Sequence, residues 1–124
     1  MAHTYDDNNV FAKMLRGEIP CNTIQDNEHA LAFHDINPQT PTHALVIPKG
    51  RYISADDFLN EASDAEIAGF FRTLGRVARE LGVQENGYRL LANCGRDAHQ
   101  EVPHFHVHIF AGCDLGAMIQ PKRG

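Results

Sequence analysis

Residues 104–109 read His104-Phe105-His106-Val107-His108-Ile109, so histidines and apolar residues alternate throughout this segment. Successive side chains of a β-strand point to opposite faces of its sheet. We therefore predict a strand over residues 104–110 that presents all three imidazoles on one face, about 7 Å apart along the strand. The apolar residues of the strand would face the other way, under a long helix, and form part of the core.

Three imidazoles on one face do not favour a purely structural sheet, because clustered rings repel when protonated and lower one another's pKa. Two chemical interpretations are open. A metal site would need a further ligand, for which His43 and His34 are candidates on other strands and Asp97 and Glu101 in the preceding loop. A nucleophilic site would use the central neutral imidazole to attack phosphorus. Its neighbours would then hydrogen-bond the phosphoryl oxygens and protonate the leaving group.

The clearest helix in the sequence lies over residues 63–81. Ser63 and Glu66 form a capping box at its start, and Gly82 stands where many helices end. Apolar residues repeat at helical spacing along it and predict one face packed on the core. These residues are Ile67, Phe70, Phe71, Leu74, Val77, Ala78 and Leu81.

The remaining segments predict a short helix and further strands. The helix is expected over residues 10–16, with N-cap candidates just before it and Gly17 just after it. The strands are expected over residues 23–26, 29–36, 42–47 and 88–94, in addition to residues 104–110. This order predicts an α+β fold with a mostly antiparallel five-stranded sheet, one long helix and a short N-terminal helix.

Length and composition restrict the classes of protein that remain. A chain of 124 residues suits a single domain, with its core over about residues 10–112. The formal net charge of −5 argues against non-specific nucleic-acid binding, which needs a basic face. No stretch approaches the roughly 20 apolar residues of a membrane helix, and the N-terminus lacks the pattern of a signal peptide. Three cysteines without a CxxC pair indicate free thiols, and we expect a cytoplasmic protein.

The sequence resembles the histidine triad (HIT) family, and within it the HINT branch of nucleoside phosphoramidases. The alternating histidine motif carries this resemblance together with four other segments in the same order along the chain. These segments are Val10–Lys13, Gly17–Pro20, Phe33–Lys49 and Gln100–Pro103. The resemblance implies a HIT-like fold, a homodimer and no cofactor.

The resemblance also implies roles for the histidines and their neighbours. His106 would be the nucleophile that attacks the α-phosphorus. His104 and His108 would position the phosphate and help to protonate the leaving amine. His43 would complete a histidine relay near His104. Phosphate oxygens would be held by Asn93 and by the backbone of the loop containing Gln100, Glu101 and Val102.

The nucleoside half of the substrate would lie against a second group of residues. Asp35 would accept hydrogen bonds from both ribose hydroxyls, and a carboxylate is suited to such a diol. The base would be enclosed by Val10, Phe11, Met14, Phe33 and Ile36. His34 points away from Asp35 if residues 29–36 form a strand, so we expect a structural role for it.

Some positions depart from the family pattern. Bacterial relatives with structural zinc carry cysteines where this chain has residues 8–12, so we predict no metal. His99 stands where relatives often have glycine, and Glu101 where animal proteins often have a hydroxyl residue. His108 favours hydrolysis, because the nucleotidyl-transferase branch typically has glutamine there. The predicted activity is hydrolysis of purine nucleoside 5′-phosphoramidates through a nucleotidyl-histidine. The alternatives are a dinucleoside polyphosphate hydrolase, a nucleotide-binding regulatory protein and a histidine-rich metal site.

Overall fold

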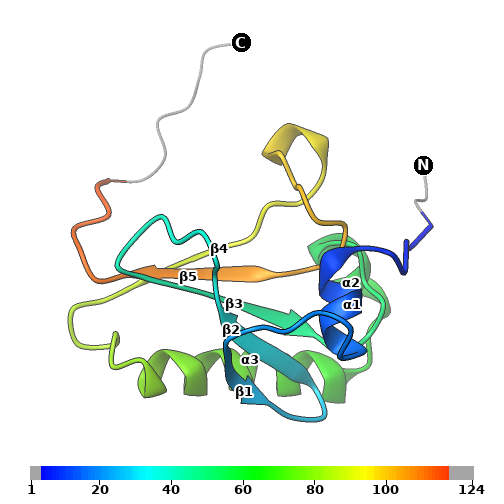
Figure 1. The fold of residues 1–124 in the computed structure, drawn as a ribbon, viewed down its shortest axis with the longest axis horizontal. Helices are drawn as coiled ribbons and strands as arrows, with labels where there is room; N and C mark the ends of the chain where they lie inside the picture. Colours follow the sequence, from blue (N-terminus) through cyan, green and yellow to red (C-terminus); the bar gives the residue numbers. More distant parts are fainter. Residues whose placement is uncertain (1–3, 118–124) are drawn as a thin grey trace.

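A computed structural model describes residues 4–117, and its centre is one antiparallel sheet of five strands in the order β1-β2-β3-β5-β4. Every neighbouring pair of strands is antiparallel. The longest helix, α3, runs along one face of the sheet (Figure 1), and the short helix α1 contributes to the other face. The predicted α+β class is confirmed. The elements are α1 (Val10–Leu15), β1 (Thr23–Asp26), β2 (Ala30–His34), β3 (Thr42–Pro48), α2 (Ala55–Glu61), α3 (Asp64–Glu80), β4 (Arg89–Leu91), a 3₁₀ turn (Arg96–Ala98) and β5 (Val107–Ala111).

Helix α3 begins and ends as its sequence predicts. The Ser63 side chain accepts from the Glu66 amide while the Glu66 carboxylate accepts from the Ser63 amide. Gly82 follows the helix with φ at +71°, a conformation that glycine adopts without strain. Phe70, Leu74 and Val77 lie in the core beneath the sheet. Phe71 is the exception, because its side chain lies at the margin of the stripe and is 43% exposed.

The apolar half of the alternating motif joins this same core. Phe105, Val107 and Ile109 are buried in the cluster that α3 covers. The hydrogen-bonded strand begins only at Val107, three residues later than predicted. The reason is that the preceding backbone bonds elsewhere: the Phe105 amide donates to the Tyr52 carbonyl at 2.8 Å, outside the sheet.

Helix α2 is a further element, which the pattern of apolar residues does not reveal because the helix has only seven residues. Ser54 and Asp57 cap its start through a reciprocal pair of hydrogen bonds. Its one buried side chain, Phe58, is fully enclosed and stacks on Phe105 with ring centroids 5.1 Å apart. The capping pair is the signal in the sequence by which this helix could have been found.

The opposite face of the sheet is covered by α1. The Asn9 side chain caps this helix by accepting from the Ala12 amide. Phe11 packs there against β2 and β3 in a second cluster, whose other buried members are Leu31, Phe33, Leu45 and Ile47. The sheet therefore separates two apolar clusters, and residues at alternate positions of β3 belong to different ones. Across residues 4–117, no helix combines the length and apolar character that crossing a membrane requires.

Candidate active site

The histidines gather on the sheet face that α1 covers. The ring of His106 lies 5.0 Å from the ring of Phe11 and 5.1 Å from that of His108, measured between centroids, and both pairs meet edge to face. The alternation of residues 104–109 therefore separates the two faces as predicted, although only His108 lies within the hydrogen-bonded strand. His106 is 7% exposed, so its ring is almost enclosed by neighbouring groups.

His43 pairs with His108, and the expectation that it lies near His104 is wrong. The cause is the register of two antiparallel strands, which places His43 opposite Phe110 and Leu45 opposite His108. His43 and His108 are thus diagonal neighbours on one face, close enough for long side chains to meet. Their facing atoms, His43 Nε2 and His108 Nδ1, are 2.9 Å apart.

Hydrogen-bond partners determine which nitrogen of each ring in this pair carries the hydrogen. The Gln39 amide donates to His43 Nδ1 at 3.1 Å, so in a neutral His43 the hydrogen is on Nε2. That N–H donates to His108 Nδ1, which leaves the His108 hydrogen on Nε2. The Asp35 carboxylate lies 3.4 Å from His43 Nε2 and would stabilise positive charge there. The result is a relay whose outer end, His108 Nε2–H, is free to donate.

The same reasoning identifies a free lone pair on His106. Its Nδ1 lies 2.7 Å from the carbonyl oxygen of His104, and a carbonyl only accepts, so Nδ1 carries the hydrogen. Nε2 of the neutral ring then has an unshared pair. An imidazole held in this tautomer by its backbone is suited to nucleophilic attack.

The site lowers the pKa of all four histidines, and burial is the first cause in each case. The pKa values of His104 and His108 fall to about 4 from an ordinary value of 6.5. Those of His106 and His43 are also lowered, and the negative charge of Asp35 partly opposes the effect of burial at both. The four rings are therefore neutral near pH 7, which keeps a nucleophilic lone pair available.

His104 does not contact the substrate side of the site, which corrects the role expected for it. Its side chain is 0% exposed and both ring nitrogens already have partners. Nε2 donates to the Pro48 carbonyl at 2.9 Å, and Nδ1 is bonded to the Tyr5 hydroxyl. It acts on the site through its carbonyl, which holds His106.

The polar loop before the histidines offers backbone donors. The Gln100 side chain ties the loop down, because its amide donates to the Ile53 and Val102 carbonyls and its oxygen accepts from the Gly95 amide. Within the part of the chain that the structure describes, the amides of Glu101 and Val102 have no hydrogen-bond partner. The Glu101 carboxylate is close enough to act on the charge of His106.

Asn93 lies three residues before the 3₁₀ turn (Arg96–Ala98), and His99 follows that turn directly. Asn93 is half-buried, and its side chain has no hydrogen-bond partner among residues 4–117. His99 adopts the left-handed conformation with φ at +58°, a backbone geometry that glycine adopts most readily. This explains in physical terms why glycine suits the position.

A cavity of about 670 Å³ lies between α1 and the end of β2. It brings together Val10, Phe11, Met14, Phe33, Ile36 and Asp35, which are the residues assigned from the resemblance to the base and the ribose. Ile36 forms its rim, since that side chain is 91% exposed. Six further residues line the cavity and were not assigned to it: Ile19, Pro20, Cys21, Asn22, His34 and Leu45. The match of Gly17–Pro20 to the family was the available signal for the first two of these residues.

The cavity adjoins the histidines through two of its own lining residues. Phe11 contacts the ring of His106, and Asp35 approaches His43. A ligand that filled the cavity with an apolar ring would extend its polar end toward these imidazoles. The arrangement separates an apolar recognition site from a reactive one.

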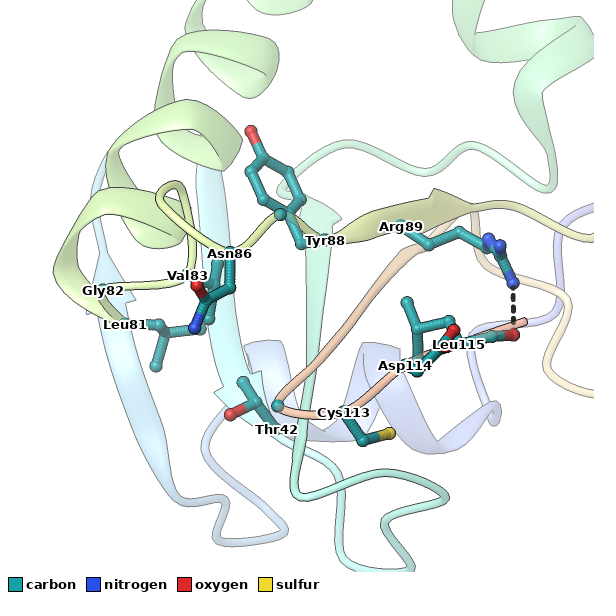
Figure 2. A pocket seen from close by; sticks show the side chains of 12 residues that line it. Thr42, Leu81, Gly82, Val83, Asn86, Tyr88, Arg89, Cys113, Asp114 and Leu115 are labelled. Carbon is teal, nitrogen blue, oxygen red and sulfur yellow. Dashed lines mark hydrogen bonds between the residues drawn. The ribbon is translucent and has the colours of Figure 1, made fainter. Parts of the chain in front are cut away.

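A second cavity, of about 780 Å³, lies elsewhere on the molecule, where the end of α3, the start of β4 and the segment after β5 meet (Figure 2). Arg89 closes one side of it by donating to the carbonyl of Leu115, and Asn86, Tyr88 and Cys113 also line it. It contains none of the predicted site residues.

Three groups could in principle hold a metal ion, because donor atoms of Asp35, His43 and His108 lie within 4.8 Å of one another. The tautomer of His43 opposes this use. Its Nδ1 accepts from the Gln39 amide, so its Nε2 carries a hydrogen and offers no lone pair to a cation. The donor set fits a hydrogen-bonded relay better than a metal site.

The five-stranded antiparallel sheet carries a cluster of imidazoles on one face, beside a largely apolar cavity. This arrangement is suited to an enzyme that uses neutral histidines on a small bound molecule. Residues 16–115 match the HIT domain family, and the chain belongs to that family. It is 66% identical over 119 residues to an uncharacterised 13.2 kDa HIT-like protein of Azospirillum brasilense, covering 96% of this chain and 98% of that one. It is 36% identical over 113 residues to the purine nucleoside phosphoramidase of Escherichia coli K12, covering 91% and 94%.

Solved structures show the same relationship. The fold superimposes on a HIT family hydrolase from Clostridium thermocellum with a TM-score of 0.84 at 37% identity, covering 92% of this chain and 98% of that one. A histidine triad protein from Clostridium difficile gives a TM-score of 0.83 at 34% identity, with 94% and 100% covered.

Proposed function

We propose that this protein is a metal-independent hydrolase that cleaves nucleoside 5′-phosphoramidates, with purine nucleosides preferred. The observation that carries the proposal is the free Nε2 lone pair of His106, fixed by the hydrogen bond from its Nδ1 to the His104 carbonyl. Membership of the HIT family supports hydrolysis of nucleotides, and the phosphoramidase from Escherichia coli supports the particular reaction.

The first step forms a bond between His106 Nε2 and the α-phosphorus and breaks the bond from phosphorus to nitrogen. The anionic phosphate raises the pKa of His108, so that this ring takes up a proton from solvent when the substrate binds. His108 Nε2–H then transfers its proton to the departing amine, and the His108 ring returns to its neutral form. The His106 ring becomes cationic in this intermediate. Its Nδ1–H still donates to the His104 carbonyl, which stabilises that charge.

The second step returns the enzyme to its starting state. A water molecule gives up one proton to His108 and attacks the phosphorus, and the bond to His106 Nε2 breaks. The products are a nucleoside monophosphate and an amine. The amides of Glu101 and Val102 are the donors that we assign to the phosphoryl oxygens in both steps, together with Asn93.

The cavity beside α1 supplies binding of the nucleoside. We assign the base to its apolar walls, formed by residues such as Phe11 and Phe33, and the ribose hydroxyls to the Asp35 carboxylate. The volume of about 670 Å³ lies in the range of small-molecule sites and accommodates a bicyclic base.

The test is turnover of adenosine 5′-phosphoramidate by wild type and His106→Ala, each with a metal chelator present. We expect full wild-type activity with chelator and a loss of at least about 10³-fold in the variant, the scale for removal of a nucleophile. His29→Ala removes a histidine outside the site and is the matched control. A nucleotide should also be trapped on the wild-type protein when a rapid reaction is quenched with alkaline denaturant and analysed by mass spectrometry, and acid treatment should release it because the bond from phosphorus to histidine is acid-labile.

Other outcomes would identify the alternatives. Activity lost with chelator and restored by zinc would indicate the metal site. Faster turnover of dinucleoside polyphosphates than of phosphoramidates would indicate the other hydrolase branch. Tight binding of AMP with no turnover of either substrate would indicate a regulatory protein.

We also propose that the protein is a homodimer that pairs through β4. This strand is an edge of the sheet, so its outer backbone groups have no partner among residues 4–117. Exposed apolar side chains accompany it: Leu90 on the strand, Tyr88 just before it and Phe71 on the adjacent helix. Sedimentation should give a dimer for wild type and a monomer for Leu90→Lys. Leu59→Lys alters a leucine of similar exposure outside this edge and should leave the dimer intact.

A further inference from the structure

Tyr5 lies beside His104, 99 residues away in sequence, and its hydroxyl is 2.5 Å from His104 Nδ1. Nε2 of that ring donates to the Pro48 carbonyl, so Nδ1 of the neutral ring has a lone pair and must accept. The direction of the bond is therefore fixed, with the Tyr5 O–H as donor. A buried imidazole with both nitrogens bonded has one tautomer and one orientation.

The segment around Tyr5 is held in place by charged groups from two other parts of the chain. The Arg51 guanidinium lies over the Tyr5 ring, 5.1 Å from its centroid. Arg51 also makes two hydrogen bonds of 2.9 Å to the Asp7 carboxylate. Arg16 donates to the Asp7 carbonyl at 2.9 Å. These contacts hold the Tyr5 side chain in place against His104.

His104 in turn holds His106, because its carbonyl accepts from His106 Nδ1–H. A change in the position of His104 moves the carbonyl that, among residues 4–117, alone keeps the His106 hydrogen on Nδ1. We propose that Tyr5 is a positioning residue, which keeps the His106 lone pair aimed at phosphorus by fixing the ring of His104. This inference rests on the proposed role of His106 as nucleophile. Tyr5 does not line the cavity that we assign to the nucleoside, so it acts on the chemical step alone.

The experiment compares Tyr5→Phe with wild type and with the control Tyr52→Phe. The control also removes one tyrosine hydroxyl, which donates to the Glu66 carboxylate at 2.8 Å and does not touch the histidines. For Tyr5→Phe we expect kcat for adenosine 5′-phosphoramidate to fall about 10-fold, with KM within twofold of wild type. Tyr52→Phe should leave both unchanged.

A second readout does not depend on catalysis. Nitrogen-15 NMR of histidine-labelled protein reports the tautomer of each ring. In wild type, His104 Nδ1 should show the shift of a hydrogen-bonded acceptor, and this signature should be lost in Tyr5→Phe and kept in Tyr52→Phe. Arg51→Gln, which keeps the hydroxyl and removes the group that holds the Tyr5 ring, should give an intermediate result if Tyr5→Phe does not fold.

The outcomes separate this inference from the proposed function. An unchanged His104 signal together with unchanged kcat in Tyr5→Phe overturns the positioning role. A rise in KM with unchanged kcat also overturns it, because that result would show that Tyr5 contributes to substrate binding alone. A third outcome is that Tyr5→Phe loses the His104 signature while the wild type shows no phosphoramidase activity. That result would support the hydrogen bond from Tyr5 to His104 and would reject the proposed function instead.

Discussion

Acidification should destabilise this protein in a window set by His104. Burial lowers the pKa of this histidine to about 4 in the folded state, whereas the unfolded chain has the ordinary value of 6.5. Between these two values the unfolded state binds a proton that the folded state does not, so stability falls as the pH falls from 6.5 to about 4. Above pH 6.5 both states are neutral at this residue, and it contributes no pH dependence.

The size of the effect follows from the difference between the two pKa values. Each unit corresponds to about 1.4 kcal/mol, so the window as a whole costs about 3 kcal/mol of unfolding free energy. About 2 kcal/mol of this should be lost by pH 5. Small domains have roughly 5–15 kcal/mol in total, so the loss is readily measured.

Urea denaturation of wild type and His104→Gln at pH 7, 6, 5 and 4 tests this directly. The variant is less stable at pH 7, because it loses the two ring hydrogen bonds. The informative quantity is the slope, since carboxylates and the other histidines titrate in both proteins and largely cancel in the difference. The free energy of wild type should fall more steeply between pH 6.5 and 4, so that the two curves converge. Parallel curves across this window would refute a buried, neutral His104.

Three further outcomes follow from the structure. Binding of AMP at pH 7 should take up a fraction of a proton, because an entering phosphate raises the low pKa of His108. Calorimetry in two buffers of different ionisation enthalpy measures this uptake. His108→Asn should abolish it. Phe58→Ala should cost about 3–5 kcal/mol in urea denaturation, since the side chain is fully buried, whereas Phe71→Ala should cost less than about 1 kcal/mol. The unfolding free energy of His99→Gly should lie within about 0.5 kcal/mol of the wild-type value, whereas His99→Val should lose about 1–2 kcal/mol, because the backbone at this residue is left-handed. Equal effects of the two changes would contradict that conformation.

Features with a local cause could be predicted from the sequence. The capping box at Ser63 and the helical repeat behind it define α3 within one residue at each end. The alternation of residues 104–109 assigns each side chain to a sheet face, and both faces are as expected. The assignment of Phe11, Phe33 and Asp35 to one pocket came from the resemblance, and the cavity brings them together.

The partner of His43 could not be predicted in the same way. Which histidine it meets depends on the register between β3 and β5, and neither strand contains that information alone. A shift of two residues in the register would move the contact from His108 to a neighbouring ring. Residues 104–106 illustrate a related limit, because their backbone bonds outside the sheet while their side chains still alternate.

Alternation of histidines and apolar residues does not predict how deeply each histidine ring is buried, and the burial and partners of each ring determine its chemistry. His104 and His106 lie on one face, yet the first has partners on both nitrogens and the second has a free lone pair. The difference arises from what covers each ring, and for His104 the covering group is Tyr5, from the opposite end of the chain. A repeated motif therefore contains residues with unequal roles. In the proposed mechanism, His104 supplies a carbonyl that fixes the tautomer of His106, His106 acts as the nucleophile and His108 transfers a proton.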